Sequence, residues 1–344
     1  MMLCCLSLPG CPGYAQNTSA WQVLPFTGQF ITRKDRELIS QSYHYGASVD
    51  FFKKTTGKKY WQYAHNYPNM GLSATWRTLG SRQVFGHVYS VLPYLEFSLF
   101  RRKTGTLQLK HGTGLALASS TYHPENNPQN RLVSTKLNAT SMIDAGYRFF
   151  LSRRWDLKAG GMLYHYSNGG LRLPNAGINA ASVYLGLAWH PESSRPDRVT
   201  HETIRDFKRW RYRLSGSAGF YGSQGENSPD IRIIPQAGAM VFAQHSTSFR
   251  TGLGIETGRL NTGNMQLCVY AEEEIQFGKI ATRYGLGGYL KNETPGQDRF
   301  YSKIGIAYYP ETENEIPGKF FFGSMLKAHG AKAAHIELMA GYVF

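Results

Sequence analysis

Polar and apolar residues alternate with a period of two along most of this 344-residue chain. In residues 155–164, Trp, Leu, Ala, Gly and Leu occupy the odd positions, whereas Asp156 and Lys158 stand among the even ones. The same pattern covers residues 141–149 and 265–277. Successive side chains of a β-strand point to opposite faces of a sheet, so a period of two predicts strands with one apolar and one polar face. The chain is therefore predicted to be all-β.

Alternating strands also occur in soluble sandwiches, but three features indicate a membrane barrel. The runs extend over about 10–13 residues, which is the length that a tilted strand needs to cross a bilayer and about twice that of a soluble strand. Charged residues such as Glu272 and Glu274 stand on the polar face. Aromatic residues, among them Trp155, Trp189 and Tyr342, stand at the ends of runs, where the aromatic girdles of a membrane barrel lie. We expect an antiparallel transmembrane β-barrel.

About 14 alternating runs, within a range of about 12–16, lie in residues 41–344 and predict a single barrel. The last run, HIELMAGYVF, ends at Phe344 and is expected to close this barrel. Its terminal Phe resembles the assembly signal of bacterial outer-membrane barrels, which implies the barrel-assembly machinery as a partner. Residues 191–207 combine charge with Pro and interrupt the alternation, so they predict a charged loop within the barrel.

The N-terminal segment is expected to be removed on export. Residues 1–15 are short and apolar and end in Ala15 before the polar Gln16, as in a signal peptide cleaved after Ala15. They contain no basic residue, which leaves two interpretations: the start of the peptide lies upstream, or Cys11 is a lipid-attachment site. Residues 16–40 alternate little and predict either a tail or a first strand.

The 38 Lys and Arg residues exceed the 23 Asp and Glu residues, which gives a formal net charge of +15. A nucleic-acid-binding module would be dominated by Lys and Arg, whereas only 18% of this chain is charged, and it contains 37 Gly and 22 Tyr residues. Several cations, among them Arg148 and Lys158, stand at lumen-facing positions of predicted strands. The surplus charge therefore does not indicate a nucleic-acid partner. Because the sequence has no run of about 18 apolar residues, transmembrane helices are excluded as well.

One segment combines residues of the kind that hydrolyse esters. His165 and Ser167 stand at odd positions of the run that begins at Trp155, so both are expected on the lipid-facing side. At about 3.3 Å per residue their Cα atoms lie roughly 6–7 Å apart, close enough for the imidazole to reach the hydroxyl. A histidine base can then activate the serine for attack on an acyl carbonyl, and nearby amides can stabilise the oxyanion. Polar residues are costly in lipid unless they function there, so the pair predicts a site beside the lipid headgroups.

The motif HYSN at residues 165–168, followed by PNAG at residues 174–177, resembles the H-x-S-N and P-N-x-G signature of lipid A 3-O-deacylases of the PagL type. These outer-membrane barrels release an ester-linked acyl chain from lipopolysaccharide. The resemblance implies a carboxylic ester hydrolase in the outer-membrane bilayer, with lipid A as its partner and with neither a metal nor another cofactor. His165 would be the base and Ser167 the nucleophile. The residues implied to shape the site or to donate to the oxyanion are Asn168, Asn175 and Gly177.

The chain departs from this signature in two ways. The family has an acid two residues after the glycine, where this chain has Asn179. A neutral amide can orient a catalytic imidazole, although it stabilises imidazolium less than a carboxylate does, so Asn179 is expected to complete the catalytic set. Family members are eight-stranded barrels with the motif near the C-terminus, whereas 165 residues follow Asn179 here. Near the motif, Arg172 is the closest candidate cation for a phosphate of the lipid.

The alternative function is a non-catalytic pore or structural barrel. Arg209, Arg211 and Arg213 alternate with apolar residues and are expected to face the lumen, where they could select anions. A lumen ladder of salt bridges with Glu272 and Glu274 is the preferred interpretation of these arginines. Under this alternative the motif forms only turns, since Ser-Asn-Gly-Gly and Pro-Asn-x-Gly are both turn sequences.

Overall fold

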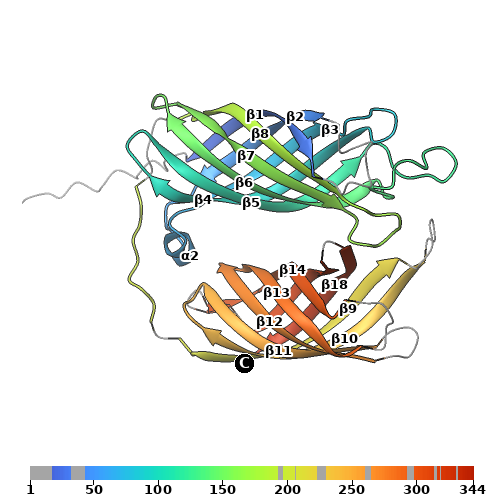
Figure 1. The fold of residues 1–344 in the computed structure, drawn as a ribbon. Helices are drawn as coiled ribbons and strands as arrows, with labels where there is room; N and C mark the ends of the chain where they lie inside the picture. The colour runs from blue at the N-terminus through green and yellow to red at the C-terminus, as the bar shows by residue number, and fades with distance from the viewer. Residues whose placement is uncertain are drawn as a thin grey trace, which may run out of the picture.

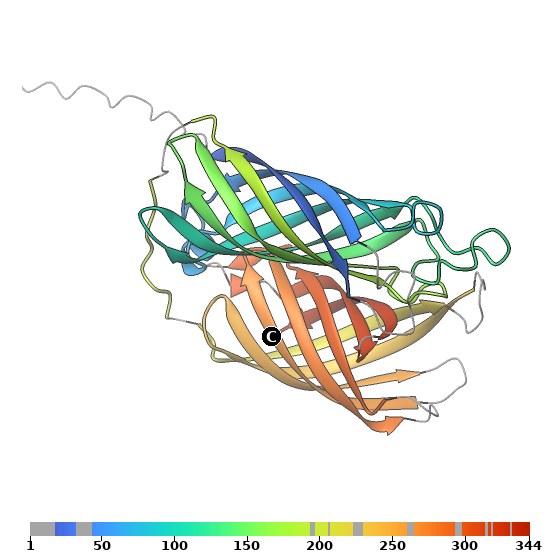
Figure 2. The same ribbon diagram turned by 45° about the horizontal axis from the view of Figure 1, so that its top comes forward.

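The strands of this protein form two closed barrels, which lie side by side (Figures 1 and 2). Each barrel consists of eight antiparallel strands in sequence order around its wall. The predicted signal peptide, residues 1–15, lies outside the described residues, and so does Cys11. The computed structural model describes residues 18–31, 43–192, 197–205, 207–222, 230–259, 265–292, 298–313, 316–317, 319–330 and 332–344.

The first barrel extends from β1 to β8. Its strands are β1 (Ser19–Phe30), β2 (Tyr43–Lys54), β3 (Asn69–Thr78), β4 (His87–Arg101), β5 (Gly105–Ala118), β6 (Leu137–Phe150), β7 (Trp155–Ser167) and β8 (Ile178–Trp189). The barrel closes because β1 pairs with both β2 and β8, which places Trp21 opposite Trp189. A short helix, α2 (Tyr60–Ala64), lies between β2 and β3. Among the described residues, no helix is long and apolar enough to cross a membrane.

The second barrel extends from β9 to β18. Its strands are β9 (Trp210–Gly222), β10 (Ile231–Gln244), β11 (Phe249–Arg259), β12 (Met265–Phe277), β13 (Ile280–Asn292), β14 (Phe300–Tyr308), β17 (Phe320–His329) and β18 (Lys332–Val343). The C-terminal strand closes this barrel by pairing with β9, which places Leu338 opposite Ala218. Two short strands, β15 (Thr312–Glu313) and β16 (Ile316–Pro317), pair with each other between β14 and β17.

The prediction of an all-β transmembrane fold is confirmed, but the prediction of a single barrel over residues 41–344 is wrong. The sixteen barrel strands lie within the expected range, yet β8 returns to β1 instead of pairing with β9. Residues 191–207, predicted as a loop within one barrel, belong to the connection between two barrels. Alternation assigns two faces to each strand but does not specify which strands pair. The pattern therefore cannot show that a barrel closes after eight strands.

Residues 16–40 contain a strand, because Ser19–Phe30 forms β1. On its outer face Trp21 and Val23 are exposed. On its inner face Leu24 and Phe26 are buried in the apolar core cluster of the first barrel. Both faces of β1 are therefore apolar, which is why a period of two is hard to see in its sequence.

Large apolar side chains cover the outer walls of both barrels. Leu163 and Val183 on the first barrel are 51% and 65% exposed, and Leu253 and Leu286 on the second are 63% and 71% exposed. Soluble monomers rarely expose contiguous apolar surface on this scale, whereas a membrane barrel needs an apolar band on its outer wall. These walls therefore face lipid.

Ion pairs fill the lumen of the first barrel. Lys158 Nζ lies 2.8 Å from Glu96 and 3.2 Å from Asp144, and all three side chains are buried. Lys110 Nζ lies 2.5 Å from Asp50. An eight-stranded barrel is just wide enough for side chains to fill its interior, so these pairs occupy the space that a pore would need.

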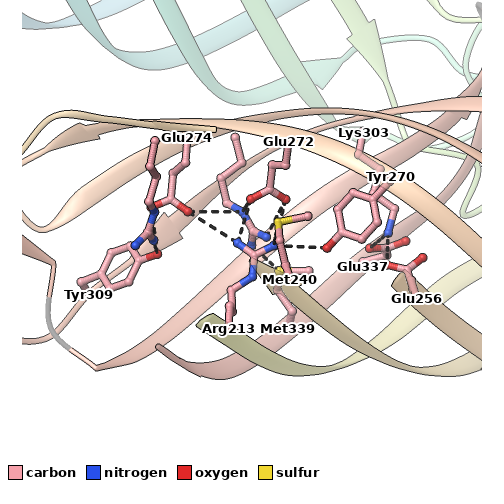
Figure 3. Close-up of polar contacts among 12 residues, drawn as sticks. Arg213, Met240, Glu256, Tyr270, Glu272, Glu274, Lys303, Tyr309, Glu337 and Met339 are labelled. Atoms are coloured by element: carbon pink, nitrogen blue, oxygen red, sulfur yellow. Dashed lines mark hydrogen bonds and ion pairs between the residues drawn. The ribbon is translucent and has the colours of Figure 1, made fainter. Parts of the chain in front are cut away.

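The lumen of the second barrel is filled in the same way. Arg213 and Arg283 share the carboxylate of Glu272, with shortest N–O distances of 2.7 Å for each guanidinium. Figure 3 shows Arg213 beside Glu272. Beside them, Lys303 Nζ lies 2.8 Å from Glu337 (Figure 3). The second lumen is therefore a ladder of buried salt bridges.

This ladder corrects the placement expected for three arginines. Arg213 is buried in the lumen, whereas Arg211 is half-buried and Arg209 is exposed ahead of β9. The preferred interpretation is confirmed for Arg213, which lies 2.7 Å from Glu272 and 3.6 Å from Glu274. The three guanidiniums do not line an open channel together, because β9 begins only at Trp210 and the partners of Arg213 fill the space beside it.

In the described part of the chain, the barrels contact each other at both ends of the molecule. We call the end of the molecule beside the β7–β8 connection the motif end, and the opposite end, where residues 190–209 join the barrels, the linker end. At the linker end α2 extends from the first barrel toward the second (Figure 1). The ring of Trp61 lies 6.3 Å from that of Phe277, and His65 Nε2 donates to the carbonyl oxygen of Gln276 at 2.8 Å. Burial at this contact lowers the pKa of His65.

Candidate active site

Strands β7 and β8 place the predicted base and its partner side by side. His165 pairs in register with Asn179, the second residue of β8. Nδ1 of His165 lies 2.7 Å from Oδ1 of Asn179. Since an amide oxygen only accepts, Nδ1 carries the proton and the lone pair of Nε2 is free. The imidazole is therefore in the tautomer that a general base requires.

Ser167, the last residue of β7, is held by two hydrogen-bond donors. Its Oγ accepts from the backbone N–H of Gly169 at 3.1 Å and from Asn175 Nδ2 at 2.9 Å. Both donors belong to the β7–β8 connection, residues 168–177. Because this connection folds back onto the hydroxyl, Ser167 is only 5% exposed, although it was expected to face lipid. His165 is half-buried on the outer wall, and the described hydrogen bonds of the two side chains do not join them to each other.

Asn168 uses its whole side chain to shape the connection. Its Nδ2 donates to Ser134 Oγ at 3.2 Å and to the carbonyl oxygen of Arg172 at 2.8 Å, and its Oδ1 accepts from the N–H of Gly170 at 3.0 Å. No donor of this amide is left for an oxyanion, so the geometry fits the site-shaping role. The side chain of Arg172 is exposed on the same connection.

Asn175 and Gly177 act on the two central side chains in different ways. Oδ1 of Asn175 accepts the N–H of Asn168 at 3.3 Å, which turns its Nδ2 toward Ser167. Gly177 has a φ of +71°, and a Cβ placed there would lie 3.1 Å from Cε1 of His165. A glycine is therefore needed at residue 177, both for the backbone conformation and for the space of the imidazole.

The connection rests on the β5–β6 loop, residues 119–136, which the sequence did not mark as part of the site. The N–H of Gly177 donates to the carbonyl oxygen of Leu132 at 2.9 Å, and Ser134 Oγ donates to the carbonyl oxygen of Arg172 at 2.8 Å. Leu132 and Ser134 are buried. They carry no catalytic signature and lie more than 30 residues from the motif, so no spacing in the sequence could have identified them.

The second barrel also reaches the connection. The N–H of Gly222, at the end of β9, donates to the carbonyl oxygen of Gly170 at 2.8 Å. Taken together, these contacts place a serine hydroxyl, two N–H donors and an imidazole with a free Nε2 at the motif end of a lipid-facing wall. Such a set can carry out nucleophilic acyl transfer. Within the described residues, no group of three or more His, Cys, Asp or Glu side chains is placed to hold a metal ion.

Two family models match this chain, one for each barrel. Residues 45–188 match lipid A 3-O-deacylase (PagL), and residues 210–344 match the C-terminal domain of acyloxyacyl hydrolase. One similar solved structure is the outer membrane enzyme PagL, with 21% identity over 48% of this chain and 97% of that chain, and a TM-score of 0.33. Another is the outer membrane protein Omp33 of Acinetobacter baumannii, with 10% identity over 96% of this chain and all of that chain, and a TM-score of 0.20. No curated protein matches the chain.

Proposed function

We propose that this integral outer-membrane protein removes an ester-linked acyl chain from lipid A, because its first barrel matches lipid A 3-O-deacylase and its second matches the C-terminal domain of acyloxyacyl hydrolase. The observation that carries the proposal is the pair of donors on Ser167 Oγ, next to an imidazole whose Nδ1 is fixed by Asn179. Ester bonds of a lipid lie at the boundary between acyl chains and headgroups, and the motif end of an outer wall lies at that boundary.

In the proposed reaction His165 is the base and Ser167 the nucleophile. Nε2 takes the proton of Ser167 Oγ, and Oγ attacks the carbonyl carbon of the acyl ester. Catalytic hydrogen bonds are often long before substrate binds, and we infer that the contact between Nε2 and Oγ forms when the ester occupies the site. The tetrahedral intermediate collapses as the alcohol leaves with a proton from His165, and water then releases the acyl chain from Ser167.

The two donors on Ser167 Oγ supply the oxyanion site of this proposal. The carbonyl carbon bonds to Oγ in the intermediate, so its oxygen lies within reach of the Gly169 N–H and of Asn175 Nδ2. Because both donors are already held beside Ser167 Oγ, only a small shift is needed for them to reach the carbonyl oxygen, and fixed donors of this kind lower the barrier. Asn179 orients the base but carries no charge, so we expect slower turnover than a carboxylate would allow. The exposed Arg172 is the proposed partner of a lipid A phosphate.

Lipid A mass spectra from cells that express the protein test this proposal. Wild type is expected to remove one acyl chain, and Ser167→Ala is expected to leave lipid A intact. Ser324→Ala, a serine on the outer wall of β17, is the matched control and is expected to behave as wild type. Equal acyl loss with Ser167→Ala would remove this serine from the mechanism, and intact lipid A with the wild type would remove the activity.

A further inference from the structure

The outer wall of the second barrel is covered where it meets the motif end of the first. On β18 Leu338 is 54% exposed, whereas Ile336 on the same face is half-buried. On β17 Phe322 is 56% exposed, whereas Leu326 on the same face is half-buried. Ile336 and Leu326 are therefore withdrawn from lipid by a neighbour, while residues further along the same strands are not.

That neighbour is the glycine turn of the motif. A Cβ placed on Gly169 would lie 2.4 Å from Cδ1 of Ile336 and 3.6 Å from Cδ1 of Leu326, so both side chains pack against the backbone of this residue. The hydrogen bond from Gly222 to Gly170 lies beside them. Strands β9, β17 and β18 of the second barrel thus contact the turn that follows Ser167.

Asn168 Oδ1 holds the N–H of Gly170, but Gly169 and Gly170 have no side chains of their own, so the position of Gly169 depends on the residues packed against it. Gly169 and Gly170 have φ values of +67° and +86°, and glycine has the largest conformational freedom of all residues. The N–H of Gly169 is one of the two donors on Ser167 Oγ. A donor that stabilises an oxyanion must be held to within a few tenths of an ångström, by residues whose own positions are fixed. Lipid is as apolar as these side chains, so their contact with the turn contributes shape and packing rather than hydrophobic stabilisation.

We propose that the second barrel completes the active site of the first, with Ile336 and Leu326 as positioning residues for the Gly169 N–H. This inference rests on the proposed function, since it assigns the N–H to the oxyanion of that reaction. It also gives the second barrel a role, because a single barrel would leave the glycine turn open to lipid on this side.

The test compares two double variants, each of which removes two large apolar side chains from β17 and β18. Ile336→Ala with Leu326→Ala is expected to lower kcat by about tenfold with an unchanged KM, since a displaced oxyanion donor affects the transition state more than substrate binding. Leu338→Ala with Phe322→Ala removes exposed side chains from the same two strands and is expected to keep the wild-type kcat. The exchange of Ile336→Leu with Leu326→Ile conserves volume and is expected to restore kcat, and heat-modifiable mobility on gels verifies that all variants fold.

If both alanine pairs have the same kcat, this inference is wrong. The proposed reaction would still be supported in that case, provided that Ser167→Ala has lost its activity. Activity that survives in Ser167→Ala would instead contradict the reaction itself. A fall in kcat that the volume-conserving exchange does not reverse would also overturn the positioning role, because packing against the turn would then not be the cause.

The linker end of the first barrel contains a cavity of about 740 Å³ that is unusually basic. Among the described residues that line it, Asp156 is the only carboxylate. Its Oδ2 lies 2.6 Å from His190 Nε2 and 3.5 Å from Arg148, which also lies 3.4 Å from the buried Glu96. The cations that line the cavity are Lys54, Arg101, Arg102, Arg148, Arg153 and Arg198.

Neighbouring groups hold two of these guanidiniums in place. One terminal nitrogen of Arg101 donates to the carbonyl oxygen of Asn66 at 2.9 Å, and the other is buried without a hydrogen-bond partner among the described residues. Arg198 lies over the ring of Tyr67 at 4.5 Å. Its neighbour Val199 donates its N–H to the carbonyl oxygen of Thr56 at 2.8 Å, which fixes the connection against the rim.

We propose that this cavity binds a phosphate-bearing anion. Six of the described cations line the cavity against one carboxylate, and they repel one another even though Arg148 is paired with Asp156 and Glu96; a bound anion lowers this repulsion. Guanidinium groups match the geometry of phosphate oxygens with paired N–H donors, and the volume is that of a typical small-ligand site. The phosphate can come from the headgroup of an anionic phospholipid at this membrane surface or from a soluble phosphate ester.

Binding experiments on the purified full-length protein separate these sources. Calorimetry with pyrophosphate probes the soluble source, and nanodiscs of phosphatidylglycerol against phosphatidylcholine probe the lipid source. The double variant Arg101→Gln with Arg198→Gln is expected to raise the Kd for the probe that the wild type binds, pyrophosphate or phosphatidylglycerol nanodiscs, by about tenfold or more. The reason is the loss of two charge-assisted contacts. Arg82→Gln with Lys136→Gln removes two exposed cations outside the cavity and is expected to leave binding unchanged. Absence of binding to both probes, or equal weakening in both variant pairs, would overturn the proposal.

Discussion

Replacing Asn179 with Asp tests how the base of the proposed reaction is oriented. The substitution keeps the size and shape of the side chain, so the 2.7 Å contact between Oδ1 and His165 Nδ1 can persist. A carboxylate can only accept from Nδ1, and it stabilises the imidazolium that forms when Nε2 takes the proton of Ser167. We therefore expect Asn179→Asp to be faster than the wild type.

The expected gain follows from the difference between neutral and charge-assisted hydrogen bonds. A neutral hydrogen bond contributes about 1 kcal/mol and one to a charged group about 1.5–3 kcal/mol. The difference of about 0.5–2 kcal/mol corresponds to a rate increase of about 2- to 30-fold. Asn179 is exposed, and screening of exposed charges favours the lower end of this range, about fivefold in kcat.

The measurement is kcat on purified lipid A in mixed micelles. Asn126→Asp introduces the same charge at an exposed loop position and is expected to match the wild type. Asn179→Leu removes the acceptor and is expected to lower kcat well below the wild-type value, because the imidazole loses its fixed tautomer. If kcat of Asn179→Asp is unchanged or lower while Asn126→Asp matches the wild type, Asn179 does not orient the base and the proposed catalytic set is wrong.

Three further predictions follow from single residues. Gly177→Ala is expected to reduce deacylation more than stability, because a left-handed backbone costs about 1–2 kcal/mol for alanine and the new Cβ meets the His165 ring at 3.1 Å; rates and heat-modifiable mobility measured on the same samples check this. Glu272→Gln is expected to destabilise the second barrel by about 3 kcal/mol, because it leaves two buried guanidiniums with only the more distant Glu274; urea unfolding measures the loss, and Glu273→Gln on the outer face is the control. Burial lowers the pKa of His65 from its usual 6.5, so the neutral form is favoured in the folded protein and its stability is expected to fall as pH drops below about 6.5. His65→Gln keeps a donor for the Gln276 carbonyl oxygen without titrating, and a pH dependence of unfolding that is the same in this variant would contradict the assignment.

The face of each strand residue is predictable from the sequence because side-chain direction in a strand is a local property. Lys158 and Glu272 stand at even positions of their runs and are buried in the lumen, whereas Leu163 and Leu253 stand at odd positions and face lipid. The motif is predictable for the same reason, since His165, Ser167 and the two turns are close in sequence. The faces of strand β1 could not be predicted in this way, because its inner face is as apolar as its outer face.

Some hydrogen-bond partners of the motif residues could be identified only from the tertiary structure. The register of β7 and β8 brings Asn179 to His165, and the short connection between these strands makes that pairing close to a local property. The donors on Ser167 Oγ depend on how the connection folds, which in turn depends on Leu132 and Ser134 of another loop. Spacing in the sequence does not encode such contacts, because their geometry is set by the side-chain packing of several loops at once.

Apart from β1, the sequence alone determined the strands, their faces, the membrane setting and the motif, all of which depend on residues within a few positions of one another. The number of barrels and the neighbour of the glycine turn were decided only by the tertiary structure. Whether β8 pairs with β1 or with β9 depends on which strand edges meet after tilt and register are set around a whole barrel. The contact of Ile336 with Gly169 joins residues far apart in the chain, and it exists because two closed barrels present their outer walls to each other in lipid.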